Sequence, residues 1–300
     1  MTALSPLLKQ ATPVTIDHAL GSEVFDVDGN RHLDFTSGIG VVSTGHCHPK
    51  VVAAAQEQVG KLIHGQYTTV MHQPLLALVD KLQGVLPSHL DSLFFANSGS
   101  EALEASLRLS RQATGRPNVI VFHGGFHGRT VATATMTTSG TRFSAGFSPL
   151  MGGVVMTPFP HALRHGWSVA DAVDFALAEL DYLMATRVDA REIAALLIEP
   201  VLGDGGYLPT PPRFLAGLRE RADRHGILLV IDEVQAVYRT QGVAIHDKHI
   251  EIIIRQMLRR GTVIESGSTE FLPGTLVDLS EAKLANAEAI QGGVQPAELR

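Results

Sequence analysis

A short polar turn in the chain could bind an anion. It reads Asn97-Ser98-Gly99-Ser100-Glu101-Ala102, follows an apolar run at residues 93–96 and opens into a predicted helix. The first N–H groups of a helix are unpaired and the helix dipole favours negative charge beside them, so a phosphate would be held well there. The same residues also make an ordinary helix cap, with Ser98 or Ser100 at the N-cap and Glu101 in the first turn. The turn by itself leaves both interpretations open.

A second, glycine-rich turn follows the apolar run at 119–122 and reads His123-Gly124-Gly125-Phe126-His127-Gly128-Arg129-Thr130. Its glycines let the backbone approach a ligand closely, and Phe126 offers a flat apolar face for stacking. A core phenylalanine in a glycine-rich turn is the alternative. The histidines here and in His46-Cys47-His48 lack the spacing of a zinc site, so we expect no metal.

Two carboxylates follow apolar runs directly. Glu199 comes after residues 193–198, and Asp232 comes after residues 227–231. A carboxylate at the end of a buried strand is costly unless it is paired, so each is expected to meet a cation or a strong donor. A solvated strand end or a local salt bridge is the alternative for each.

The elements that must position these residues follow from the spacing of apolar side chains. Alternating runs around Asp28-Gly29-Asn30 predict a β-hairpin over residues 23–35, and helical spacing predicts helices near 51–62 and 75–82. Four predicted strands then alternate with three predicted helices, which indicates an α/β layer with a largely parallel sheet that binds ligands at the carboxyl ends of its strands. The strands are 93–96, 119–122, 193–198 and 227–231, and the helices are near 101–113, 169–184 and 212–225.

Composition narrows the class of protein. The chain has 300 residues, 45% of them hydrophobic, which predicts a globular fold, and 24 basic against 30 acidic residues offer no broad basic surface for nucleic acid. The single cysteine, Cys47, cannot form an internal disulfide, and the N-terminal residues do not resemble a signal peptide. No apolar run approaches the roughly 20 residues that a membrane span needs. We therefore expect a cytoplasmic protein without a membrane span that handles small molecules.

Taken in order, the motifs resemble the class III aminotransferases of the acetylornithine, ornithine and 4-aminobutyrate aminotransferase type. The resemblance runs from about Val24 to Gln235 without an obvious gap. The matching motifs are Gly38-Ile39-Gly40-Val41, Thr44-Gly45-His46-Cys47-His48-Pro49, Asn97-Ser98-Gly99-Ser100-Glu101-Ala102, Phe126-His127-Gly128-Arg129-Thr130, Glu199-Pro200-Val201 and Asp232-Glu233-Val234-Gln235.

The resemblance implies a pyridoxal 5'-phosphate (PLP) cofactor and a set of residues that bind it. Gly99 and Ser100 would hold its phosphate, Phe126 would stack on its pyridine ring and His127 would lie beside it. Asp232 would pair with the pyridine nitrogen, so that the ring can withdraw electrons from the substrate. Val234 would pack on the opposite face of the ring, Gln235 would reach the phenolic oxygen, and Glu199 would lie near the substrate. The resemblance also implies a homodimer.

The resemblance stops after Gln235. The family continues into Gly-x-Gly-Arg-Thr-Gly and places its Schiff-base lysine roughly thirty residues past the aspartate, whereas this chain reads Ala236-Val237-Tyr238-Arg239-Thr240-Gln241-Gly242. Only Lys248 and Lys283 follow Asp232, and neither has a matching context. Residues 234–300 instead resemble a C-terminal segment of the bacterial RNA polymerase β′ subunit, so the junction falls at Val234-Gln235, which both families share. Within this segment, the spacing of apolar residues predicts an amphipathic helix over residues 248–260. The nearly equal numbers of acidic and basic residues in the segment argue against electrostatic binding to DNA.

These observations predict a truncated PLP-dependent transferase of fold type I, a three-layer α/β/α domain with a mainly parallel sheet and an unrelated tail. The expected domains are an N-terminal β segment at 1–45, a partial PLP-binding domain at 46–235 and the polymerase-like tail at 236–300. The family reaction moves an amino group from an amine or amino acid to a 2-oxo acid. Without its lysine this chain is expected to be inactive. The alternative is a non-enzymatic fusion product or interaction protein with a transcription-related tail.

Overall fold

A computed structural model describes residues 11–87, 90–232, 260–265, 267–269, 276–278, 286 and 298–299 of the chain. Its contacts divide into two compact units, Met1–Ser88 with Tyr238–Arg300, and His89–Val237. Each unit is described by itself. The domain limits expected from the sequence stay a prediction.

The first unit contains a small antiparallel sheet in which strand β2 (Glu23–Asp26) pairs with both β1 (Ile16–Leu20) and β3 (Arg31–Leu33). The hairpin predicted over 23–35 is confirmed, because β2 and β3 pair from Glu23 opposite Leu33 to Phe25 opposite Arg31. The Asp26 carboxylate accepts the N–H groups of Asp28 and Asn30 at 3.1 and 2.8 Å, which shapes the turn. Hydrogen bonds from His32 and Asn30 lower the pKa of Asp26 to about 2.

Helices α1 (Ser37–Gly40), α2 (Pro49–Val59) and α3 (Gln73–Gln83) follow in the first unit. The predictions of helices near 51–62 and 75–82 are confirmed by α2 and α3. The same unit holds β10 (Arg260–Glu265), which pairs antiparallel with β11 (Leu276–Asp278) and β12 (Glu298–Leu299). The amphipathic helix predicted at 248–260 lies outside the described residues except for Arg260, which begins a strand.

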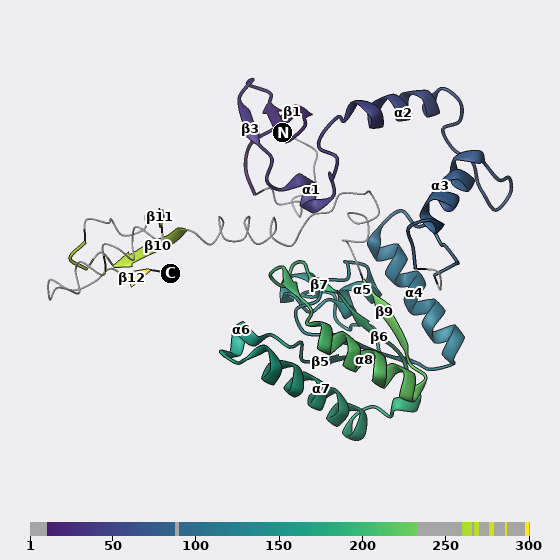
Figure 1. Cartoon of the computed structure of the whole chain (residues 1–300), viewed down its shortest axis with the longest axis vertical. Coiled ribbons are helices and arrows are strands. Elements are labelled where there is room, and N and C mark those ends of the chain that lie inside the picture. The colour runs from purple at the N-terminus through teal and green to yellow at the C-terminus, as the bar shows by residue number, and fades with distance from the viewer. Residues whose placement is uncertain are drawn as a thin grey trace. The chain divides into compact units, whose positions relative to one another are not determined.

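The second unit is built on a four-stranded parallel sheet in the order β5-β4-β6-β9 (Figure 1). Its strands are β5 (Val154–Thr157), β4 (Asn118–Phe122), β6 (Ile193–Ile198) and β9 (Leu228–Ile231). Its helices are α4 (Gly99–Thr114), α5 (Val131–Met136), α6 (Ala162–His165), α7 (Val169–Thr186) and α8 (Pro212–His225), with 3-10 turns at Thr141–Phe143 and Ala190–Glu192 and a small hairpin of β7 (Val201–Leu202) and β8 (Leu208–Pro209). The parallel sheet and the helices predicted for this region are confirmed.

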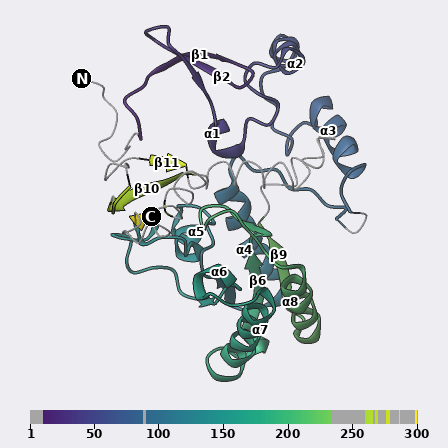
Figure 2. The same cartoon turned by 60° about the vertical axis from the view of Figure 1, so that its left-hand side comes forward.

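Alternate side chains of the central strands bury opposite faces of this sheet, as the twofold repeat of a strand requires. On β4, Ile120 and Phe122 join the cluster under α7 and α8, while Val119 and Val121 join the cluster under α4 and α5. Figure 1 shows α7 and α8 on one side of the strands and α4 on the other, and Figure 2 shows the same elements from a second direction. The three-layer α/β/α arrangement expected from the sequence is therefore present in the second unit.

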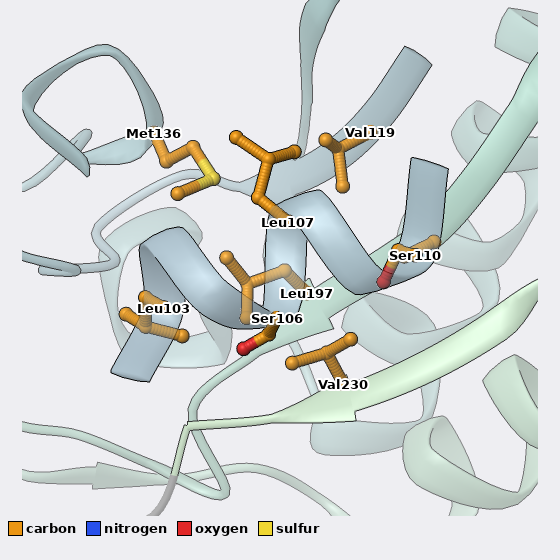
Figure 3. A pocket seen from close by; sticks show the side chains of 9 residues that line it. Leu103, Ser106, Leu107, Ser110, Val119, Met136, Leu197 and Val230 are labelled. Atoms are coloured by element: carbon orange, nitrogen blue, oxygen red, sulfur yellow. The ribbon is translucent and has the colours of Figure 1, made fainter. Parts of the chain in front are cut away.

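The contact between α4 and the sheet is apolar and contains a small cavity (Figure 3). Leu103 and Leu107 of α4 face Val119, Leu197 and Val230 across it. Ser106 also lines the cavity, but its hydroxyl donates to the Ala102 carbonyl of its own helix. The cavity is thus part of the apolar core between α4 and the sheet.

Helix α7 illustrates how the apolar pattern places a helix on the sheet. Ser168 caps it by accepting the N–H of Asp171, and its buried face carries Ala172, Val173, Ala176 and Leu180. Charged residues interrupt its apolar character on the outer side. Within the described ranges, no helix is long and apolar enough to cross a membrane.

The sequence predicted one strand that does not form and missed another that does. Residues 93–96 form no strand, and Phe94 is 71% exposed, because the described part of the chain supplies no neighbouring strand to pair with them. Strand β5 was not predicted, although Val154 and Val155 follow the turn-forming pair Gly152-Gly153. Four residues are too few for periodicity to distinguish a strand from a loop.

Phe214 is expected to carry much of the stability of the second unit. Its ring is fully buried and packs edge-on against Phe122 and Phe159, with centroids 5.5 and 6.3 Å away. Phe214→Ala should lower the free energy of unfolding by about 3–5 kcal/mol, because it leaves a cavity between helix and sheet. Urea denaturation followed by far-ultraviolet circular dichroism measures this. Tyr182→Ala, at a position 64% exposed on α7, is the control and should change stability by less than about 0.5 kcal/mol.

Candidate active site

The glycine-rich loop, residues 123–130, connects the candidate site residues. It leaves the carboxyl end of β4 and runs to the N-terminus of α5. Its backbone or side chains contact Ser100, Glu199 and Asp232, each of which comes from another segment of the second unit. Since β4, β6 and β9 are parallel neighbours, their carboxyl ends meet at one edge of the sheet, which brings these residues together.

The polar turn before α4 caps the helix and also leaves donors available. Ser98 is the N-cap and its hydroxyl accepts the N–H of Glu101 at 3.2 Å, while the Glu101 carboxylate accepts the N–H of Asn97 at 2.6 Å. Among the described residues, no acceptor is assigned to the N–H groups of Gly99 and Ser100. The cap therefore does not compete with an anion for these two donors.

Gly128 lets the glycine-rich loop pass directly over the start of α4. Its φ is +127°, and a Cβ added there would lie 2.2 Å from Ser100 Oγ and 2.6 Å from Thr133 Oγ1. The Thr133 hydroxyl accepts the N–H of Thr130 at 2.9 Å, so it has little freedom to move aside. This position requires glycine for both backbone conformation and space.

Asp232 is paired with a buried histidine. The Asp232 Oδ2 atom lies 2.9 Å from Nδ1 of His127, a residue only 3% exposed. The backbone N–H of Asp232 donates to the Ile198 carbonyl. The backbone N–H of His127 donates in turn to the Thr137 hydroxyl at 2.9 Å. The expectation that Asp232 meets a strong donor or cation is thus met by a side chain of the glycine-rich loop.

Glu199 is buried and accepts two backbone hydrogen bonds. Oε1 accepts the N–H of Phe126 at 2.6 Å, and Oε2 accepts the N–H of Gly203 at 2.8 Å. Burial raises the pKa of the Glu199 carboxyl above its ordinary value, and the nearby charge of Asp232 adds to the rise, while the two N–H groups and His127 oppose it. The carboxyl joins two loops at the carboxyl edge of the sheet.

Sequence reasoning missed two threonines that hold the glycine-rich loop. Thr137 accepts the N–H of His127 and its hydroxyl lies 3.0 Å from the Gly128 carbonyl, while Thr138 accepts the N–H of Gly125 at 3.0 Å and donates to the Phe122 carbonyl at 2.7 Å. The threonine-rich run over residues 133–138 was the available signal. Hydroxyl groups that both donate and accept can satisfy loop backbone groups that have no backbone partner of their own.

Several predicted residues are not part of this arrangement. Val234, Gln235, Lys248 and Lys283 lie outside the described residues. His46 belongs to the first unit, where its Nε2 lies 2.7 Å from Asp34 Oδ2, and this contact lowers the pKa of Asp34. His48 caps α2. In the described part of the chain, no group of three or more histidine, cysteine or acidic side chains is placed to hold a metal.

An α/β domain that brings a helix N-terminus, a half-buried phenylalanine and a histidine-paired aspartate to one edge of a parallel sheet has the architecture of the PLP-dependent transferases. The family model described as aminotransferase class-III matches residues 7–245. The chain belongs to the class III aminotransferase family, as its motifs predicted. Its cofactor is accordingly pyridoxal phosphate.

Curated relatives agree with this membership. The chain is 42% identical over 227 residues to 5-aminovalerate aminotransferase DavT of Pseudomonas putida, covering 75% of this chain and 52% of the relative. It is 38% identical over 228 residues to 4-aminobutyrate aminotransferase GabT of Escherichia coli, covering 76% of this chain and 52% of the relative. The chain thus spans about half the length of these relatives.

Solved structures match over the same extent. A taurine:2-oxoglutarate aminotransferase from Bifidobacterium kashiwanohense, in complex with PLP and glutamate, has a TM-score of 0.71 at 25% identity and covers 76% of this chain and 52% of its own. A PLP-bound amine transaminase from an uncultivated Pseudomonas species has a TM-score of 0.71 at 27% identity, covering 78% and 56%. The fold expected from the sequence is confirmed.

A second family model, RNA polymerase Rpb1 domain 5, matches residues 224–296. It confirms the resemblance of the C-terminal segment to an RNA polymerase subunit. The two models overlap over residues 224–245, a stretch that contains the shared dipeptide Val234-Gln235.

The described residues fit the cofactor in three respects. The donors of Gly99 and Ser100 suit a phosphate, the half-buried Phe126 offers a ring face, and Asp232 keeps Oδ1 without a partner assigned among the described residues. The buried His127 holds the other oxygen of that carboxylate. The donors, the ring face and the carboxylate therefore match the phosphate, the pyridine ring and the ring nitrogen of PLP in kind.

Gly128→Ala should disrupt the contact between the glycine-rich loop and α4. The added methyl group must displace Ser100 or Thr133, and the positive φ adds strain, so we expect a loss of about 1–3 kcal/mol in the free energy of unfolding. Urea titration measures the loss. Gly152→Ala, where an added Cβ meets nothing within 4 Å, is the matched control. Equal stability of the two variants would contradict the packing described above.

Glu199 should make stability depend on pH. Because its pKa is raised in the folded chain, the folded state binds the proton more tightly than the unfolded state, and stability falls as pH rises from the ordinary value of 4.5 through the raised value. Glu199→Gln removes this ionisation, so its stability should rise relative to wild type between pH 4.5 and about pH 7. Urea midpoints at both pH values test this, with Glu192→Gln on the exposed turn before β6 as control. Parallel profiles for wild type and Glu199→Gln would refute it.

Proposed function

We propose that the class III aminotransferase part of this chain binds PLP at the carboxyl edge of its parallel sheet. The observation that carries the proposal is the convergence of Ser100, His127 and Asp232 through the glycine-rich loop. Three separate sequence segments meet there, and each supplies the chemistry that one part of the cofactor needs. The family membership supports the same assignment.

Each residue has a definite proposed role. The N–H groups of Gly99 and Ser100 hold the phosphate at the positive end of the α4 dipole. Phe126 stacks on one face of the pyridine ring, and Asp232 keeps a proton on the pyridine nitrogen. His127 orients the Asp232 carboxylate through its Nδ1 contact of 2.9 Å. Bound PLP supplies an electron sink for the substrate.

Three further roles come from the family resemblance. Val234 packs on the ring face opposite Phe126, and Gln235 binds the phenolic oxygen. Glu199 lies on the substrate side, where its raised pKa lets the carboxyl hold a proton at higher pH than an exposed glutamate does. Glu199 also fixes the N–H of Phe126, so it acts on the stacking residue as well.

We infer that the chain binds PLP without turning over substrate, since the Schiff-base lysine of the family has no counterpart in matching context. Lys248 and Lys283 are the only lysines after Asp232. Loss of the lysine removes both the covalent attachment and a proton carrier, and general acid–base catalysis alone is worth roughly 10²–10⁴-fold in rate.

The proposed substrates are an amine or amino acid donor and a 2-oxo acid acceptor. The relatives are named for 5-aminovalerate, 4-aminobutyrate and acetylornithine, which indicates donors bearing an amino group far from a carboxylate. A homodimer, a cytoplasmic location and no contact with nucleic acid complete the proposal. They rest on the family and on the acidic balance of the chain.

A non-enzymatic fusion product or interaction protein with a transcription-related tail is the second candidate. The match of residues 224–296 to RNA polymerase Rpb1 domain 5 favours it. PLP binding distinguishes the two candidates. The first predicts that the chain binds PLP, and the second does not require any binding.

Incubation of the full chain with PLP, followed by borohydride reduction and mass spectrometry, tests the proposed function. We expect saturable PLP binding and no reduced adduct on Lys248 or Lys283. Asp232→Asn should weaken binding roughly tenfold to a hundredfold, because a hydrogen bond to a charged group is lost. Asp223→Asn on the exposed side of α8 is the control. An adduct on either lysine would refute the missing-lysine account, and no binding at all would favour the second candidate.

A further inference from the structure

Phe126 is held by a second aromatic ring that the family motifs do not include. The ring of Phe143, in the 3-10 turn Thr141–Phe143, meets the ring of Phe126 at an interplanar angle of 62° with centroids 4.9 Å apart. This edge-to-face arrangement is a favourable one for aromatic pairs. The Phe143 edge therefore restricts the orientation of the Phe126 ring.

Phe143 is supported in turn by charged neighbours. The guanidinium carbon of Arg142 lies 4.6 Å from the Phe143 ring centroid, and Arg142 Nη2 lies 2.9 Å from Asp204 Oδ1. A guanidinium over an aromatic face is attracted by the ring, and the carboxylate fixes its position. Arg142, Phe143 and Asp204 are together called the ring support.

The ring support connects to the backbone of Phe126 by a second route. Asp204 follows Gly203, whose N–H donates to Glu199 Oε2, and Glu199 Oε1 accepts the N–H of Phe126. The backbone of Phe126 is thus fixed through Glu199, while its ring is fixed through Phe143. Both restraints lead to the short stretch Gly203-Asp204.

Phe126 needs such restraint because its own loop supplies little. It lies between Gly125 and His127, with Gly128 next, and glycines place few steric limits on a neighbouring ring. The ring is only half buried. A stacking face is effective only if it is held parallel to its ligand, so the restraint has to come from outside the loop.

We propose that Phe143, backed by Arg142 and Asp204, is a positioning residue that orients the Phe126 ring for stacking on the cofactor. The inference rests on the proposed binding of PLP beside Phe126. It assigns the 141–143 segment and Asp204 a role in cofactor affinity through Phe126, without direct contact with the reacting atoms.

The first test measures PLP affinity and the circular dichroism that bound PLP acquires. Phe143→Leu should weaken binding roughly twofold to tenfold and reduce the signal per bound PLP, because the ring edge is lost. Phe143→Tyr keeps the ring and should restore both values. Phe147→Leu, at a nearby exposed phenylalanine, is the matched control. Arg142→Gln should have a smaller effect in the same direction, since an exposed ion pair contributes little stability.

A double-mutant cycle separates positioning from general loss of structure. In a Phe126→Leu background, Phe143→Leu should cause no further loss of PLP affinity, because the ring that it positions is gone. An equal loss in both backgrounds would overturn the proposal, as would wild-type affinity and dichroism in Phe143→Leu.

A second test does not depend on PLP. In protein labelled with 4-fluorophenylalanine, the ¹⁹F line of Phe126 is the one that Phe126→Leu removes. Phe143→Leu should shift or broaden this line and Phe147→Leu should leave it unchanged, and an unshifted line would overturn the ring support. If wild-type protein binds no PLP, the proposed function fails and the cofactor role of Phe143 fails with it, whereas the restraint on Phe126 is still decided by the ¹⁹F line.

Discussion

The second unit depends on how the glycine-rich loop satisfies its backbone hydrogen bonds. The N–H of His123, where the loop leaves the buried strand β4, donates to the Thr157 carbonyl of β5. Beyond His123 no described strand pairs with the loop, so its next N–H groups need acceptors from elsewhere. Glu199 accepts the N–H of Phe126, Thr137 accepts that of His127 and Thr138 accepts that of Gly125. All three acceptors follow the loop in the sequence, two directly after α5 and one directly after β6. The same bonds that stabilise the loop therefore bring the site residues to one edge of the sheet.

The site concentrates two carboxylates and one imidazole in partly buried surroundings. The charge of Asp232 raises the pKa of Glu199 and His127 opposes that rise, while His127 Nδ1 also lies 2.9 Å from Asp232 Oδ2. His127 is 3% exposed, so its ring cannot turn toward water instead. In a partly buried charged network, removing one member leaves its partner charged and unpaired. That loss destabilises the fold more than replacing the whole network with apolar residues would. Such a network is well suited to hold a charged ring nitrogen of a cofactor in place.

The class III aminotransferase match and the polymerase match share one chain. The described site lies within the first match, and of its residues only Asp232 falls in the stretch 224–245 that both models match. Its last member, Asp232, is also the last residue described before 260. Among the described strands the order is β5-β4-β6-β9, so β9, which Asp232 follows directly, lies at an edge of the described sheet, with Leu228 39% and Ile231 41% exposed. The aspartate is nevertheless held, because its partners are the Ile198 carbonyl and His127, both from strands or loops on the inner side of the sheet.

The motifs in the sequence were sufficient to predict the family and the parallel sheet. Because the carboxyl ends of parallel strands must share an edge, they also led us to expect Glu199 and Asp232 at one edge of the sheet, while the cofactor roles of Gly99, Ser100, Phe126 and Asp232 stay predictions. They also predicted that Asp232 would need a strong donor. Only the tertiary structure identified that donor as His127, placed Gly128 over Ser100 and added Thr137, Thr138 and Phe143. These contacts join segments distant in the sequence, where no periodicity or spacing records the pairing. Residues 93–96 show the converse, since an apolar run becomes a strand only when a neighbouring strand supplies its hydrogen bonds.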